Sequence, residues 1–171
     1  MTAARDSQRS KVYDAEHLVR RVFERADESG TRNLELLGSH LTLPIERKFA
    51  SVESVQTYVD RVLALNWVRA KWPRAAVPVH VRERQGMSAA HYEMLTSTIA
   101  VPIKRMEAAW ALRELVVLHE LAHHLEAAES GNAPHGPVFV SRFLELVTEI
   151  VGPEAGLVLR STMADCGVRF N

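Results

Sequence analysis

The chain has 171 residues, of which 47% are hydrophobic and 25% charged, proportions that are ordinary for one globular domain with a buried core. Its 21 basic and 21 acidic side chains balance, so the composition indicates neither nucleic acid nor an anionic membrane as a partner. Cys166 is the single cysteine, which excludes an internal disulfide, and the first ten residues lack the apolar run of a signal peptide. We therefore expect a cytoplasmic protein.

The first half of the chain predicts a helix, a pair of short strands and a second helix. Residues 1–10 are polar and are expected to form a disordered tail. Apolar residues at helical spacing predict an amphipathic helix over residues 11–28 that ends at Gly30. Leucines alternate with polar residues around Gly38, which predicts two strands joined by a tight turn or one strand bent at Gly38. A valine repeat then predicts a helix over residues 51–65, followed by an irregular connection.

The second half predicts three short strands and then three helices. The strands are expected over residues 78–84, 89–92 and 96–103, and the helices over 106–128, 137–151 and 153–164. This order of elements predicts an α+β fold, with a single domain over residues 11–171.

The clearest chemical signal is the run His119-Glu120-Leu121-Ala122-His123. On a helix, the two histidines lie one turn apart on the same face, where they can bind one metal ion, and the glutamate between them can act as a base. The surrounding helix is apolar on most sides and is therefore expected to be buried, so its polar side chains need partners. A metal ion is one such partner. The alternative is a core helix whose histidines form hydrogen bonds with their neighbours.

A catalytic zinc of this kind needs a third protein ligand and an open position for water. The metzincin pattern fails, because Glu126 and Glu129 stand where that class has Gly and His. The thermolysin-like pattern takes a Glu from a following helix, which leaves Glu145 and Glu149 as possible ligands.

We favour His135 as the third ligand. The turn-forming residues 130–134 let the chain fold back, and Pro137 suits the first turn of the next helix. The positive end of that helix keeps the imidazole neutral, as a metal ligand must be. The alternative is that His135 only caps a turn.

This region also resembles a known family. Residues 119–123, followed by His135-Gly136-Pro137-Val138-Phe139, resemble the active site of SprT-like zinc metallopeptidases, in which the His before Gly-Pro is the third ligand. Residues 12–159 resemble more closely a family of small, largely uncharacterised bacterial zinc metallohydrolases. The shared features are Gly38-Ser39, Leu41-Thr42-Leu43-Pro44, Ala90-His91-Tyr92-Glu93 and Trp110-Ala111-Leu112-Arg113-Glu114-Leu115. In SprT proteins a C-terminal Cys-rich zinc ribbon is associated with DNA binding. This chain has no such ribbon, so no nucleic acid is expected as a partner.

The resemblance implies a zincin-like fold, with a small, mostly antiparallel sheet packed on the active-site helix and further helices at both ends. The strand that borders the cleft of such a fold is an edge strand, and residues 96–101 are the expected counterpart here. An extended peptide could pair with this edge through main-chain hydrogen bonds.

The expected function is that of a zinc metallopeptidase or other zinc-dependent hydrolase, with one Zn²⁺ per chain held by His119, His123 and His135. Glu120 would assist the attack of a zinc-bound water on a carbonyl and return the proton to the leaving amine. The expected substrate is a peptide or protein, or else a small amide. The alternative is a non-catalytic metal-binding or regulatory protein with the same fold.

Other polar residues near the motif have less specific expectations. Tyr92 and His91 are candidates for a second group that stabilises the oxyanion, although ordinary strand packing is the favoured interpretation of both. His124 points about a hundred degrees away from His123 around the helix and is not expected to be a ligand. Four acidic residues could accept hydrogen bonds from the far ring nitrogens of the ligands: Glu114, Glu126, Glu129 and Glu145.

Overall fold

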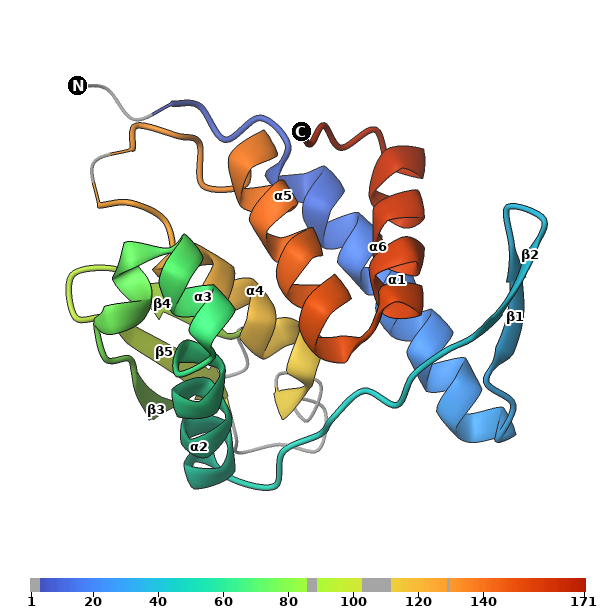
Figure 1. Ribbon diagram of the computed structural model, residues 1–171, viewed down its shortest axis with the longest axis horizontal. Coiled ribbons are helices and arrows are strands. Elements are labelled where there is room, and N and C mark those ends of the chain that lie inside the picture. The colour runs from blue at the N-terminus through green and yellow to red at the C-terminus, as the bar shows by residue number, and fades with distance from the viewer. Residues whose placement is uncertain (1–3, 86–88, 103–111, 129) are drawn as a thin grey trace. The chain divides into compact units, whose positions relative to one another are not determined.

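Helices and short strands divide between two units of the chain in the computed structural model, which describes residues 4–85, 89–102, 112–128 and 130–171. Unit 1 comprises Met1–Glu46 and Gly131–Asn171, and unit 2 comprises Arg47–Ser130. Figure 1 shows the elements of both units in the colours of the chain order. The architecture is a mixture of helices and small sheets, as the α+β prediction requires.

Unit 1 is mainly helical. Its elements are α1 (Arg9–Ser29), β1 (Asn33–Leu36), β2 (Ser39–Thr42), α5 (Pro137–Leu146), the π-helical turn η3 (Val147–Val151) and α6 (Pro153–Asp165). The three helices predicted in this part of the chain are confirmed within a few residues at their ends. Gly30 ends α1 in a left-handed conformation, with φ of 69°, and Pro137 stands in the first turn of α5.

The helices of unit 1 share one apolar core. Helix α6 contacts both α1 and α5, and the three lie side by side in Figure 1. The largest buried side chains of these helices form the core of unit 1: Phe23, Phe139, Phe143, Leu144, Leu146, Leu159 and Met163. Among the helices of the described residues, none is both long enough and apolar enough to cross a bilayer.

The leucine alternation around Gly38 forms a hairpin. Strands β1 and β2 pair antiparallel, with Leu36 opposite Ser39. Leu37 and Gly38 form the turn, and both have positive φ, of 51° and 76°. The first of the two predicted alternatives, two strands joined by a tight turn, is therefore confirmed.

The described residues of unit 2 form a small sheet and three α-helices. Its elements are α2 (Val52–Leu63), α3 (Asn66–Lys71), the 3₁₀ turn η1 (Pro73–Ala76), β3 (His80–Arg84), β4 (His91–Glu93), β5 (Thr98–Pro102) and α4 (Glu114–His124). The predicted helix over residues 51–65 is confirmed as α2, which Ser51 caps through a reciprocal pair of hydrogen bonds with Ser54.

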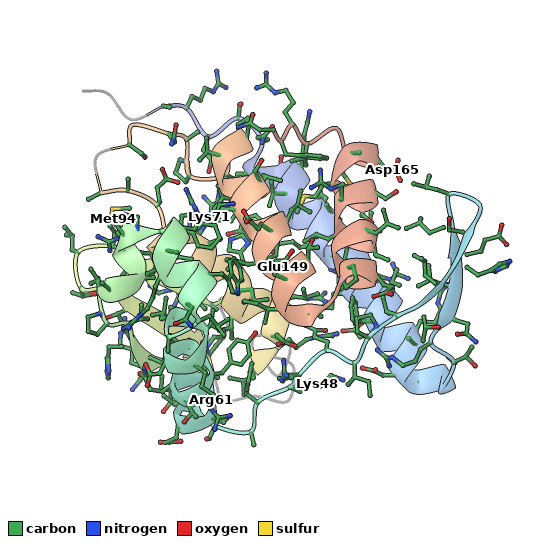
Figure 2. All side chains as sticks on the ribbon, viewed as in Figure 1. Lys48, Arg61, Lys71, Met94, Glu149 and Asp165 are labelled. Atoms are coloured by element: carbon green, nitrogen blue, oxygen red, sulfur yellow. The ribbon has the colours of Figure 1, made fainter. Side chains whose placement is uncertain are left out.

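The sequence analysis missed α3 and η1, which fill the predicted irregular connection. The capping signals of α3 are weak, because no side chain caps its first residue. Basic side chains favour the C-terminal ends of helices, and Figure 2 shows Arg61 at the end of α2 and Lys71 at the end of α3.

The three-stranded sheet of unit 2 corrects one prediction. Its strand order is β3-β5-β4, with β5 parallel to β3 and antiparallel to β4. Residues 96–101, predicted to form an edge strand, thus contribute most of the central strand. The apolar run over residues 99–102 explains this position, and all five residues of β5 are buried. The edges among the described strands are β3 and β4, and the sheet is mixed.

The motif helix is shorter than the predicted range of 106–128. Helix α4 begins at Glu114, directly after a backbone bridge between Lys48 and Arg113, and ends at His124. Residues 103–111 lie outside the described residues, and with them part of the predicted helix and Trp110 and Ala111 of the family resemblance.

Gly156 lies where α6 approaches η3 closely enough to leave no room for a side chain. A Cβ atom at this position would lie 2.1 Å from Oγ1 and 2.9 Å from Cβ of Thr148. We expect Gly156→Ala to reduce the free energy of unfolding by about 1–3 kcal/mol, because the contact forces α6 away from η3. Urea unfolding measures this change, with Ser161→Ala on the same helix as the control. Equal stability of the two variants would contradict the close contact.

Candidate metal centre

The first two candidate ligands lie on α4, as the motif predicts. His119 is buried and His123 is half-buried. Their Nε2 atoms are 3.2 Å apart and the ring centroids 4.9 Å apart, with the ring planes inclined at 68°. One helical turn therefore brings the same nitrogen of both rings to one point.

This spacing fits a shared zinc ion. Two Zn–N bonds of about 2.0–2.1 Å at the tetrahedral angle place their nitrogens about 3.3 Å apart. The observed 3.2 Å between Nε2 of His119 and Nε2 of His123 matches that separation. The distance is therefore compatible with two ligands of one metal ion, and it is also a distance at which the two rings can form a hydrogen bond.

His135 lies on the turn immediately before α5 and is 5% exposed. Its Nδ1 lies 2.7 Å from Oδ2 of Asp6, and its backbone N–H donates to Oδ1 of the same carboxylate at 3.3 Å. The rings of Tyr13 and Phe139 contact the imidazole, with centroids 5.2 Å and 5.1 Å away. Because Nδ1 is engaged by Asp6, Nε2 is the nitrogen that can bind a metal.

The third predicted ligand, His135, belongs to unit 1, whereas His119 and His123 belong to unit 2. Among the described residues, these three histidines are the group that could hold a metal ion, and this group includes neither Glu145 nor Glu149.

The N-terminal segment contains two site residues that the sequence analysis missed. The expectation for residues 1–10 was a disordered tail, yet Asp6 contacts His135 and Gln8 is 5% exposed. The Gln8 amide donates to the carbonyl oxygen of His135 at 2.9 Å. No local pattern signals these contacts, because more than a hundred positions separate the partners.

Glu114 anchors the start of α4. Its buried carboxylate accepts hydrogen bonds from the backbone N–H of Arg47 at 2.9 Å, from the Arg47 guanidinium at 2.6 Å and from the Tyr58 hydroxyl at 2.7 Å. The hydrogen bond with Glu114, and then its negative charge, raise the pKa of Arg47. Of the four predicted acidic partners, Glu114 thus fixes the helix that carries the motif, and Glu129 lies outside the described residues.

His124 anchors the other end of α4. Its Nε2 lies 3.0 Å and 3.1 Å from the carbonyl oxygens of Arg74 and Val77, and its Nδ1 lies 2.9 Å from the Tyr92 hydroxyl. Arg74 donates to the carbonyl oxygen of His124 and to the Tyr92 hydroxyl. These contacts are consistent with a neutral ring that donates from Nε2 and accepts at Nδ1.

The remaining candidates occupy different surroundings. Glu120 is 5% exposed and follows His119 on α4. The Tyr92 hydroxyl contacts His124 and Arg74, which fits the packing interpretation. His91 contacts Glu93 on the same strand at 3.1 Å.

Burial of the His124 ring, and then the charge of Arg74, lower the pKa of His124 from 6.5 to about 4. In the unfolded chain the ring takes up a proton below pH 6.5, whereas in the folded chain it stays neutral down to about pH 4. The free energy of unfolding should therefore decrease as the pH falls from 6.5 towards 4. The contribution of His124 to this decrease is on the order of 3 kcal/mol.

Urea unfolding at about pH 7.5 and about pH 4.5, in the presence of a chelator, measures this decrease. His124→Gln cannot titrate but can still donate to the two carbonyl oxygens, so its stability should fall less between the two pH values. An equal fall in the wild-type chain and the variant would show that His124 does not cause the acid sensitivity.

A comparison of the chain with protein families, with curated proteins and with solved structures found no match to any of them. The resemblance to SprT-like metallopeptidases, and the zincin-like fold that it implies, accordingly stay predictions from the sequence.

Proposed function

We propose that the protein is a zinc-dependent hydrolase that cleaves peptide or amide bonds. In this proposal His119, His123 and His135 bind one Zn²⁺ per chain, and Glu120 is the catalytic base. The observation that carries the proposal is the 3.2 Å separation of the Nε2 atoms of His119 and His123, one turn apart on a buried helix.

The donor set supports zinc. Imidazole nitrogen is a borderline-soft ligand that suits zinc, and three such ligands are typical of catalytic zinc sites. Structural zinc sites usually close the fourth position with another Cys or His. The group of potential ligands found among the described residues has three members, and Cys166 does not belong to it. A three-histidine group of this kind supports a catalytic interpretation.

The chemistry follows from the residues around this position. Bound zinc lowers the pKa of a coordinated water to about 7 and polarises a carbonyl. Glu120 is adjacent to His119 in the helix but is not among the ligands, so its carboxylate can take a proton as water attacks the carbonyl. The same carboxyl group can then deliver the proton to the leaving amine. A bond between a carbonyl carbon and an amine nitrogen is therefore the proposed target.

Metal analysis of untagged protein tests the site. We expect about one zinc per chain, and loss of that zinc in His119→Ala and in His135→Ala, since each variant removes one of three ligands. His40→Ala, on the exposed β2 strand, is the matched control and should keep the metal. Full zinc content in His135→Ala would exclude His135 as a ligand.

Replacement of the base tests the enzyme. Glu120→Gln should retain zinc and lose roughly 10²–10⁴-fold in the rate of hydrolysis of a peptide or amide library, because the amide cannot accept the proton. Glu28→Gln, at an exposed position of α1, is the control and should stay active. Zinc retention with no hydrolysis by the wild-type chain would instead favour a non-catalytic metal-binding or regulatory protein.

A further inference from the structure

We propose that Asp6 is a positioning residue of the metal centre, which holds the His135 ring so that Nε2 is its ligand atom. This inference rests on the proposed function, because it assumes that His135 binds the metal. Asp6 lies outside the motif region and 129 positions before His135.

The carboxylate of Asp6 fixes the tautomer of the ring. A neutral imidazole carries one N–H, and an ionised carboxylate only accepts hydrogen bonds. The 2.7 Å contact between Oδ2 of Asp6 and Nδ1 of His135 therefore places the hydrogen on Nδ1. In this tautomer the lone pair lies on Nε2, as it must on a nitrogen that binds a metal ion.

The same carboxylate also fixes the position of the ring. Its second oxygen, Oδ1, accepts from the backbone N–H of His135 at 3.3 Å, so Asp6 holds both the side chain and the backbone of the ligand. Tyr13 of α1 and Phe139 of α5 contact the faces and edges of the imidazole and limit its rotation. The Asp6 side chain is 22% exposed, so water screens this contact only in part.

Gln8 attaches the segment that carries Asp6. Its side chain donates to the carbonyl oxygens of His135 and Arg169, both at 2.9 Å, and accepts from the backbone N–H of Arg169 at 3.0 Å. The chain around Asp6 is therefore tied both to the ligand and to the C-terminal residues. This support lets Asp6 act as a fixed acceptor.

Carboxylate partners of metal-bound histidines orient the ring and increase its basicity, and their loss typically costs 10–100-fold in metal affinity. A hydrogen bond that serves only the fold would leave the affinity unchanged once the protein is folded. Zinc affinity therefore separates the two roles of Asp6.

The first measurement is competition for Zn²⁺ between the full chain and a chromophoric chelator. We expect Asp6→Ala to weaken binding by roughly 10–100-fold and Asp6→Asn by less, because the amide oxygen can still accept from Nδ1. Asp14→Ala, which removes the same charge from an exposed position of α1, is the control and should bind as the wild-type chain does. Wild-type affinity in Asp6→Ala would overturn the proposal.

The second measurement needs no metal. In the zinc-free chain at about pH 8, ¹⁵N spectra of the side chain should show the hydrogen of His135 on Nδ1, with His135→Gln identifying the signals. In Asp6→Ala this preference should disappear, and an unchanged tautomer would contradict the role of Asp6. If the wild-type chain bound no zinc, the proposed function would be wrong. The spectra would still show whether Asp6 determines the tautomer of the His135 ring.

Discussion

The candidate metal centre depends on one constraint: the polar side chains of a buried helix need hydrogen-bond partners or a bound ion. Helix α4 buries Glu114, His119, Glu120 and His124, and the cost of desolvating these groups has to be offset by partners. Glu114 finds Arg47 and Tyr58 at the start of the helix, and His124 finds two carbonyl oxygens and a tyrosine at its end. The pair formed by His119 and His123 lies between these two anchored ends.

The two neighbouring histidines His123 and His124 illustrate how the helix separates roles. A rotation of about a hundred degrees between successive residues directs their rings to different surroundings. The His124 ring is completely buried, and its lowered pKa keeps it neutral, so it can donate and accept as a fixed structural group. His123 is half-buried, with Nε2 beside that of His119. The His124 ring holds the helix in place, and His123 is one of the two predicted ligands on this helix.

The elements that the sequence predicted well are those governed by local periodicity. Helices α1, α2, α5 and α6 follow from apolar residues at helical spacing and from Gly or Pro at their ends, which act within a few residues. The place of β5 was predicted incorrectly, because an apolar run fits a buried strand but does not say which strands pair with it. Helix α3 was missed because it is short and lacks a capping side chain.

The sequence alone predicted the ligand pair and the base, since the i and i+4 positions of a helix share one face wherever that helix lies. It also narrowed the third ligand to His135, Glu145 or Glu149. Only the tertiary structure revealed Asp6 and Gln8 as partners of His135, because these contacts join residues 127 to 129 positions apart. Such contacts depend on how the chain packs, and hydrogen bonds over that separation leave no periodic trace in the residues between them.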